Sequence, residues 1–299
     1  MKEFIQEIPN NFYHVYLNTY EGTSFNNEDI IGERFTLVLL LGNSGSLTLN
    51  NKTVCYITPS LFCLNEVDHL ILPEANGTIV KAVFFTPSVV NSQLDFNMVR
   101  NIPDGSSANI YLDRDMMKSF IIRKAGYLGQ YNLGPISEKK LLGIFYQVQR
   151  ILESGSSTWP CKSRSYFFEM LLYIDNLFET DAYSDEVMLD EKEEEMNAII
   201  LYLHQNYEDK ITIQDITERF HISKTTLANM FRSKMDETFL TYLNKLRISI
   251  ASTMLRDTLL PITDIMLRVG FSDSAHFLRT FKKLSGMTPS AYREKYCWM

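Results

Sequence analysis

The sequence has no long apolar run, and cysteine and histidine are both scarce. No stretch of 18 or more apolar residues occurs among the 299 residues, so we expect no membrane span. The four cysteines show no CxxC pair and no metal-ligand spacing, which predicts reduced thiols in a cytoplasmic protein. They are Cys55, Cys63, Cys161 and Cys297. The first nine residues carry Glu3 and Glu7 without an apolar segment, so we expect no signal peptide.

Charge is distributed unevenly along the chain. The net charge of −7 at pH 7 would by itself argue against a nucleic-acid partner. Residues 1–190 hold 14 basic and 22 acidic residues, whereas residues 210–299 hold 14 basic and 8 acidic residues. This asymmetry predicts an acidic N-terminal region joined to a basic C-terminal region that contacts phosphates.

Short strands separated by turns are predicted from about residue 10 to residue 86. Apolar or β-branched runs occur at residues 12–20, 35–41, 46–49, 53–57, 61–64, 68–72 and 78–85. Asn50 and Asn51 stand between two of these runs and can adopt the positive φ of a tight hairpin. Strands this short, with turns this frequent, are typical of a β-sandwich or a small barrel.

Two amphipathic helices are predicted after the strands. Apolar residues recur at helical spacing over residues 138–153 and 164–178. The short connection at residues 154–157 predicts that the two helices form an antiparallel hairpin. Two interpretations are open: the apolar stripes cover the β-structure, or they form the seam of a homodimer through residues 138–178.

Domain boundaries follow from the segment at residues 181–195. This segment is acidic and poor in large apolar residues, which predicts a linker. We therefore place one domain at residues 1–180 and a second at residues 196–299. Strands and helices in the first domain, followed by a purely helical pattern in the second, predict an α+β multidomain protein.

Two similar helix-turn-helix units are predicted in the second domain, at residues about 211–233 and 262–284. Ser223 and Ser272 stand where the N-cap of each second helix is expected, and Gly270 fits a turn position with positive φ. A long helix at about 238–257 joins the units. Its apolar side consists of Leu240, Leu243, Leu246, Ile250, Met254 and Leu255.

The second helix of each unit has one apolar and one polar side. Leu227 and Phe231 lie four residues apart on the apolar side of the first, which leaves the opposite side free to contact DNA. Asparagine can pair with adenine and arginine with guanine, whereas lysine more often contacts phosphate. The predicted base contacts are Thr225, Ala228, Asn229, Ser274, His276 and Arg279. The predicted phosphate contacts are Lys224, Arg232, Lys282 and Lys283.

The length of the joining helix predicts how the two units meet DNA. About 18 residues at a rise of ~1.5 Å span roughly 27 Å. This length approaches the ~34 Å between successive major grooves on one face of the duplex. We therefore expect one chain to contact two adjacent major grooves over a site of about 17–20 base pairs.

The C-terminal third of the chain contains the pattern of a known family. Residues 270–283 are GFSDSAHFLRTFKK, and residues 285–293 are SGMTPSAYR. Together they resemble the signature of the AraC/XylS family of bacterial transcriptional regulators, which residues 211–231 and 242–255 match less closely. The resemblance covers about residues 196–296. It implies a DNA-binding domain of seven helices, with the second helix of each unit in the major groove. The family often has arginine where this chain has Asn229, so a base preference there cannot be transferred.

A looser resemblance is carried by residues 37–41, 45–52 and 58–64. These residues are similar to the cupin-like regulatory domain of the same family. The resemblance implies a cupin-like β-barrel that binds a small effector, followed by a helical dimerisation hairpin. The candidate polar groups of the effector pocket are His14, Tyr16, Arg34 and Glu66. RNA polymerase is a further candidate partner besides double-stranded DNA. Two modes of regulation, activation and repression, are both open.

Two other functions are weighed against effector binding. A cupin enzyme would need several metal-binding histidines, but the barrel region has only His14 and His69 and no HxH pair. We therefore expect no catalysis, no metal and no cofactor. In the second alternative the barrel binds no effector and serves only as a platform for a dimer or another partner. A pocket would favour an effector, and a filled barrel would favour the platform.

Overall fold

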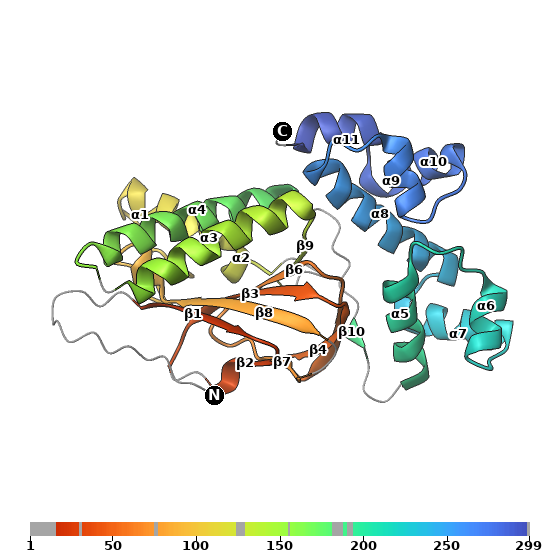
Figure 1. Cartoon of the computed structure of the whole chain (residues 1–299), viewed down its shortest axis with the longest axis horizontal. Coiled ribbons are helices and arrows are strands. Elements are labelled where there is room, and N and C mark those ends of the chain that lie inside the picture. Colours follow the sequence, from red (N-terminus) through yellow and green to blue (C-terminus); the bar gives the residue numbers. More distant parts are fainter. Residues whose placement is uncertain are drawn as a thin grey trace.

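Figure 1 shows a β-rich N-terminal region, overlaid by helices on one side, next to an all-helical C-terminal region. The computed structural model describes residues 16–29, 32–74, 77–123, 129–154, 156–180, 188–189 and 194–297. Antiparallel sheets followed by a helical domain confirm the predicted combination of folds. None of the helices in these ranges is long and apolar enough to cross a membrane.

The described strands pair into two antiparallel sheets of five strands each. The first has the order β1-β8-β3-β6-β9 and the second the order β10-β5-β4-β7-β2. The strands of the first sheet are β1 (Leu17–Gly22), β3 (Phe35–Gly42), β6 (Ser60–Leu64), β8 (Thr78–Phe85) and β9 (Gln130–Asn132). Those of the second are β2 (Phe25–Asn26), β4 (Gly45–Leu49), β5 (Lys52–Tyr56), β7 (Leu70–Leu72) and β10 (Met188–Leu189). Two short 3₁₀ helices, η1 (Asn27–Asp29) and η2 (Pro87–Val89), follow β2 and β8.

Strand β3 has buried side chains on both faces of its sheet, which explains why its sequence is almost entirely apolar. Successive side chains of a strand point to opposite faces of the sheet. Val38 and Leu40 pack between the two sheets, whereas Leu37 and Leu39 pack under the helices, so both faces are buried. The sheets therefore form a sandwich with an apolar interior. The closed barrel expected from the sequence does not occur among the described strands, because the two sheets share no hydrogen-bonded strand pair there.

Four helices cover the outer face of the first sheet. They are α1 (Ala108–Asp115), α2 (Lys118–Ile121), α3 (Pro135–Glu153) and α4 (Trp159–Thr180). The predicted hairpin corresponds to α3 and α4, which pack against each other. Phe145 and Phe167, one from each predicted stripe, lie in the same core as Leu37 and Val83 of the sheet. Most of each apolar stripe therefore covers the sheet, and only a few apolar side chains stay on the outside.

Residues 194–297 form seven helices, the number that the family resemblance implies. They are α5 (Glu194–Asn206), α6 (Ile213–Arg219), α7 (Lys224–Met235), α8 (Phe239–Asp257), α9 (Ile262–Arg268), α10 (Ser274–Ser285) and α11 (Pro289–Tyr296). One apolar cluster runs through all of them and includes Ile216, Leu246 and Phe277. In contrast to the prediction, Leu240 at the start of α8 is exposed, because Phe239 and Leu243 occupy the buried side of that turn.

The N-terminal and C-terminal regions touch at two places. Helix α5 lies against β4 and β5, where Cys55 joins the apolar cluster of the helical domain. At the far end of α8, Asp257 accepts hydrogen bonds from the backbone N–H of Gly134 (2.9 Å) and the hydroxyl of Ser137, both at the start of α3. Strand β10 pairs with β5, so the predicted linker contains a strand that the sequence did not indicate.

Candidate nucleic-acid interface and ligand pocket

The first helix pair consists of α6 and α7 joined by a four-residue turn. Thr212 and Asp215 form a capping box at the start of α6, in which each side chain accepts from the other's backbone N–H. The hydrogen bonds from Thr212 also lower the pKa of the Asp215 carboxyl. Ser223 caps α7 by accepting from the backbone N–H of Thr226, as predicted. Between the helices, His221 adopts a left-handed conformation with φ of 56°.

The second helix pair, α9 and α10, repeats this arrangement with other residues. Gly270 has φ of 84°, which confirms the predicted turn glycine. The predicted N-cap Ser272 is wrong, because α10 begins one residue later than expected. Its N-cap is Asp273, whose carboxylate accepts from the backbone N–H of His276. Gly286, with φ of 75°, ends α10.

Helices α7 and α10 each bury one side and expose the other. Leu227 and Phe231 hold α7 in the core, and Phe277 and Phe281 hold α10. All ten side chains predicted to contact DNA lie on the exposed sides. Figure 1 shows both helix pairs on the side of the helical domain that faces away from the sheets. The two polar helix sides are therefore accessible in the same molecule.

The core beneath the first pair contains a partly buried histidine. His204 of α5 shares a hydrogen bond of 2.6 Å between its Nε2 and the hydroxyl of Tyr242 in α8. Burial lowers the pKa of His204 to about 4, so the ring is neutral at pH 7. Its other ring nitrogen is buried without a hydrogen-bond partner among the described residues. His204 therefore belongs to the packing of the domain and not to its exposed surface.

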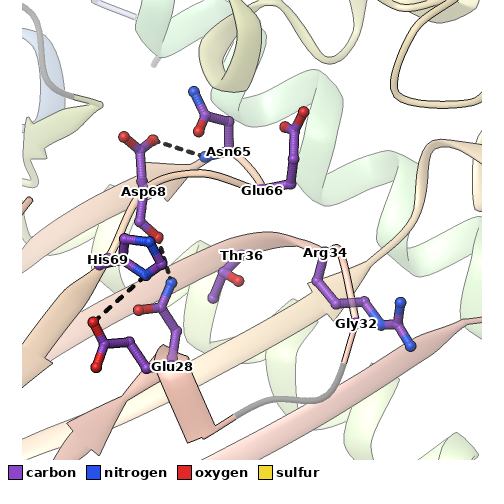
Figure 2. Close-up of a pocket in the computed structure, with 9 residues that line it drawn as sticks. Glu28, Gly32, Arg34, Thr36, Asn65, Glu66, Asp68 and His69 are labelled. Carbon is purple, nitrogen blue, oxygen red and sulfur yellow. Dashed lines mark hydrogen bonds and ion pairs between the residues drawn. The ribbon is translucent and has the colours of Figure 1, made fainter.

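A small polar pocket lies at one end of the sandwich, where β3 begins. It has a volume of about 120 Å³, smaller than most sites for drug-sized ligands. Its lining residues are Asn27, Glu28, Gly32, Arg34, Thr36, Asn65, Glu66, Asp68 and His69. Figure 2 shows Arg34 and Thr36 on one side of the pocket, with Asp68 and His69 on another. The interior between the sheets is filled by apolar side chains, so this pocket lies at its margin.

The pocket contains two of the four predicted effector contacts. Arg34 and Glu66 line it, whereas Tyr16 is not among its lining residues and His14 lies outside the described residues. The guanidinium of Arg34 lies 5.0 Å from the centroid of the Tyr16 ring, which places Tyr16 next to the pocket. The Glu66 side chain is 7% exposed and forms an ion pair with Arg100 through one carboxylate oxygen. Its second oxygen has no hydrogen-bond partner among the described residues.

Neither a metal centre nor a disulfide is found in the described part of the chain. No group of three or more histidine, cysteine or acidic side chains there could hold a metal ion. All four cysteines are free. Burial raises the pKa of the Cys55 thiol to about 12, so that thiol is protonated and unreactive at neutral pH.

Sequence reasoning missed a set of buried charges in α8. Arg256 and Asp257 are both about 1% exposed at the side chain, with 2.8 Å between Nε and a carboxylate oxygen. Arg256 also donates to the backbone carbonyl of Asn132 in β9. Arg247 is buried in the middle of the same helix. The available signal was a charged residue on the apolar side of a predicted helix. Charged residues are rarely buried without partners, so such a position indicates a buried ion pair or hydrogen bond.

Comparison with known proteins agrees with this geometry. Residues 216–295 match a family model described as a helix-turn-helix domain. The chain is 33% identical over 99 residues to the melibiose operon regulatory protein of Escherichia coli K12, which covers 33% of each protein. It is 29% identical over 192 residues to the raffinose operon transcriptional regulatory protein RafR of Pediococcus pentosaceus, or 64% of this chain and 66% of that protein.

A solved structure is also similar over the C-terminal region. The C-terminal domain of the response regulator yesN from Fusobacterium nucleatum is 30% identical, with 33% of this chain and 96% of that domain covered and a TM-score of 0.32. The chain spans between 20% and 66% of the length of the first curated relatives.

The matched proteins are helix-turn-helix regulators of transcription and not enzymes. The C-terminal region therefore carries a helix-turn-helix domain of the kind found in AraC/XylS transcriptional regulators.

Proposed function

We propose that the chain is an effector-responsive transcription factor that binds double-stranded DNA through two helix-turn-helix units. In this proposal α7 and α10 enter adjacent major grooves. The observation that carries it is that both helices expose a polar side and bury the opposite one. Thr225, Ala228 and Asn229 would contact bases from α7, and Ser274, His276 and Arg279 from α10.

Positive charge on the same two helices supports a phosphate-binding role. Lys224 and Arg232 are exposed on α7, and Lys282 and Lys283 are exposed on α10. Phosphate contacts fix the position of a protein on DNA without reading its sequence. We assign these four side chains to phosphates.

In this proposal the two domains have separate functions. Residues 1–180 would sense the effector, and residues 196–299 would bind DNA in the cytoplasm. The relatives regulate melibiose and raffinose operons by name, which makes small polar molecules the first effectors to test. The pocket with Arg34 and Glu66 supports a hydrogen-bonding ligand of modest size. A ligand shifts a regulator only if it binds one arrangement of the domains better than the other.

The outer side of the α3–α4 hairpin supports a homodimer. Most of the predicted stripes are buried against the sheet, but Tyr146 and Leu172 are about half exposed, and Ile136 is 39% exposed. Apolar side chains left on an outer helix face favour association with a second copy. Dimerisation would pair two DNA sites, and RNA polymerase would be the partner of the DNA-bound form.

Selection of fragments from a random duplex pool by the purified full-length chain tests the DNA-binding proposal. We expect recovery of one asymmetric motif that spans two major grooves, with an affinity that falls steeply as salt rises. Recovery of no motif, with and without melibiose or raffinose, would contradict the proposal.

Single substitutions then separate base contacts from phosphate contacts. Arg279→Ala should weaken binding by about 1–3 kcal/mol and relax specificity at one base pair. Lys283→Ala should weaken binding of all sequences alike and reduce the salt slope by about 1. Arg150→Ala, at an exposed position of α3, is the matched control and should leave DNA binding unchanged.

A further inference from the structure

Arg247 lies in the middle of α8, the helix between the two helix pairs. Its side chain is buried, yet its hydrogen bonds go to backbone carbonyls and not to a carboxylate. The Nε donates to the carbonyl of Tyr207 (2.8 Å), and Nη2 donates to the carbonyl of Asp209 (2.7 Å). Both carbonyls belong to the connection between α5 and α6. Arg247 therefore fixes the chain segment that leads into the first helix pair.

The same guanidinium contacts the turn of the second helix pair. Its central carbon lies 5.7 Å from the centroid of the Phe271 ring. Gly270, next to Phe271, approaches so closely that a Cβ there would lie 2.6 Å from the Tyr207 carbonyl oxygen and 2.7 Å from Nη2 of Arg247. The turn between α9 and α10 thus packs directly on the connection between α5 and α6.

These contacts hold the two helix pairs to each other as well as to α8. A helix such as α8 sets the distance between the two helix pairs attached to it. Each pair could still change its orientation relative to that helix. Arg247 removes that freedom because two hydrogen bonds and one ring contact meet on a single planar group. A side chain of this kind has five donors in a fixed fork, so it constrains direction as well as distance.

We propose that Arg247 is a positioning residue that fixes the distance and rotation between α7 and α10 on DNA. This inference rests on the proposed DNA-binding function. One added base pair moves a half-site by about 3.4 Å and rotates it by roughly 35° around the duplex. A protein whose two reading helices are clamped cannot follow that change, so it should accept one spacing between half-sites.

The test compares the spacing that wild-type and variant chains accept. Both are used to select duplexes from a random pool, and each is then titrated on the wild-type motif with zero or one base pair inserted between its halves. The wild-type chain should lose at least about 100-fold in affinity on insertion, because the second contact can no longer form. Arg247→Met should recover the same half-motifs at several spacings, with an insertion penalty below about 10-fold.

Two glycine substitutions supply a matched control. Gly270 and Gly286 both have positive φ, so alanine is strained at each. At Gly270 the new Cβ would also strike Tyr207 and Arg247, whereas at Gly286 nothing lies within 4 Å. Gly270→Ala should broaden the accepted spacing as Arg247→Met does. Gly286→Ala should retain the single spacing of the wild-type chain.

Three results would overturn the proposal. The first is an Arg247→Met variant that keeps the single spacing and the full insertion penalty, which would leave Arg247 a packing role only. The second is a wild-type chain that tolerates the inserted base pair, and this measurement needs no variant to fold. The third is a wild-type chain that recovers no two-part motif, in which case the proposed function fails as well.

Discussion

The two helix pairs have the same architecture but meet its local requirements with different residues. The second pair uses glycine at both left-handed positions, Gly270 and Gly286. The first pair uses His221 and Asp236 at the corresponding positions, with φ of 56° and 52°. Side chains with a Cβ are disfavoured in this conformation, so the first pair holds more backbone strain than the second.

The two ends of the helical domain, one near each helix pair, also contact the N-terminal region in different ways. Near the first pair, α5 packs on β4 and β5 through apolar side chains such as Cys55 and Ile199. Near the second pair, the contact is a buried polar cluster around Asp257. Apolar contacts tolerate small shifts, whereas a buried carboxylate requires its donors in place. We therefore expect the second contact to be more sensitive to substitution.

The largest effect is expected from Asp257→Ala. The change would leave the buried Arg256 cation without its carboxylate and the Gly134 N–H without its acceptor. Breaking a buried pair in this way costs about 3–5 kcal/mol. Urea unfolding of the full chain measures the loss, with the exposed Asp264→Ala in α9 as control. A loss below about 1 kcal/mol would mean that the polar contact is no more demanding than the apolar one.

Acid should destabilise the domain through His204, beneath the first pair. The folded pKa of about 4 lies below the value of about 6.5 in the unfolded chain, so only the unfolded state binds the proton between these pH values. Stability is therefore full above pH 6.5 and falls as the pH drops to 4, by up to about 3 kcal/mol. Unfolding of the wild type and of His204→Phe across this range measures the difference. Parallel curves for the two proteins would exclude His204 as the cause.

Removal of the N-caps should have a smaller and similar effect in both pairs. Ser223→Ala and Asp273→Ala each remove an acceptor for a backbone N–H at a helix start, at a cost of about 1 kcal/mol. Ser272→Ala is the control, because the neighbouring Asp273 caps α10. A larger loss of stability for Ser272→Ala than for Asp273→Ala would mean that Ser272 is the N-cap, as the sequence predicted.

The smallest effect is expected from relief of strain in the first pair. Asp236→Gly places glycine at a left-handed position that closes α7. We expect a gain of about 0.5 kcal/mol, because glycine adopts this conformation without steric cost but loses more chain entropy on folding. Thermal unfolding measures it, and Gly286→Asn should give a loss of similar size at the matching position. Destabilisation by Asp236→Gly would show that the aspartate side chain makes a compensating contact.

The helices of the C-terminal region could be predicted from the sequence, because the sequence patterns that specify them are local. Ser223 as an N-cap, Gly270 at a turn and apolar residues four apart each specify structure within a few residues. The exception, Ser272, was adjacent to a second good N-cap, and a choice between neighbours depends on where the helix axis points. Helix ends are for this reason the least reliable part of such a prediction.

Long-range features of the N-terminal region were harder to predict. The strand runs were found, but an edge strand of each sheet was not, because β9 and β10 are only three and two residues long. Such short strands have no pattern of their own and form because a neighbouring edge is available. The pocket combines Arg34 with Glu66 and His69 from a distant loop, so its lining could only be identified in part.

Strand β10 limits how far the DNA-binding domain can travel from its own sheets. Only residues 190–193 separate it from α5, and five Cα–Cα steps of at most about 3.6 Å give a tether of roughly 18 Å. If β10 left the sheet edge, the tether would begin after Thr180 and extend to about 50 Å. In the proposed dimer, the two-residue pairing of β10 with β5 would therefore determine whether the two copies can bind close or widely separated DNA sites.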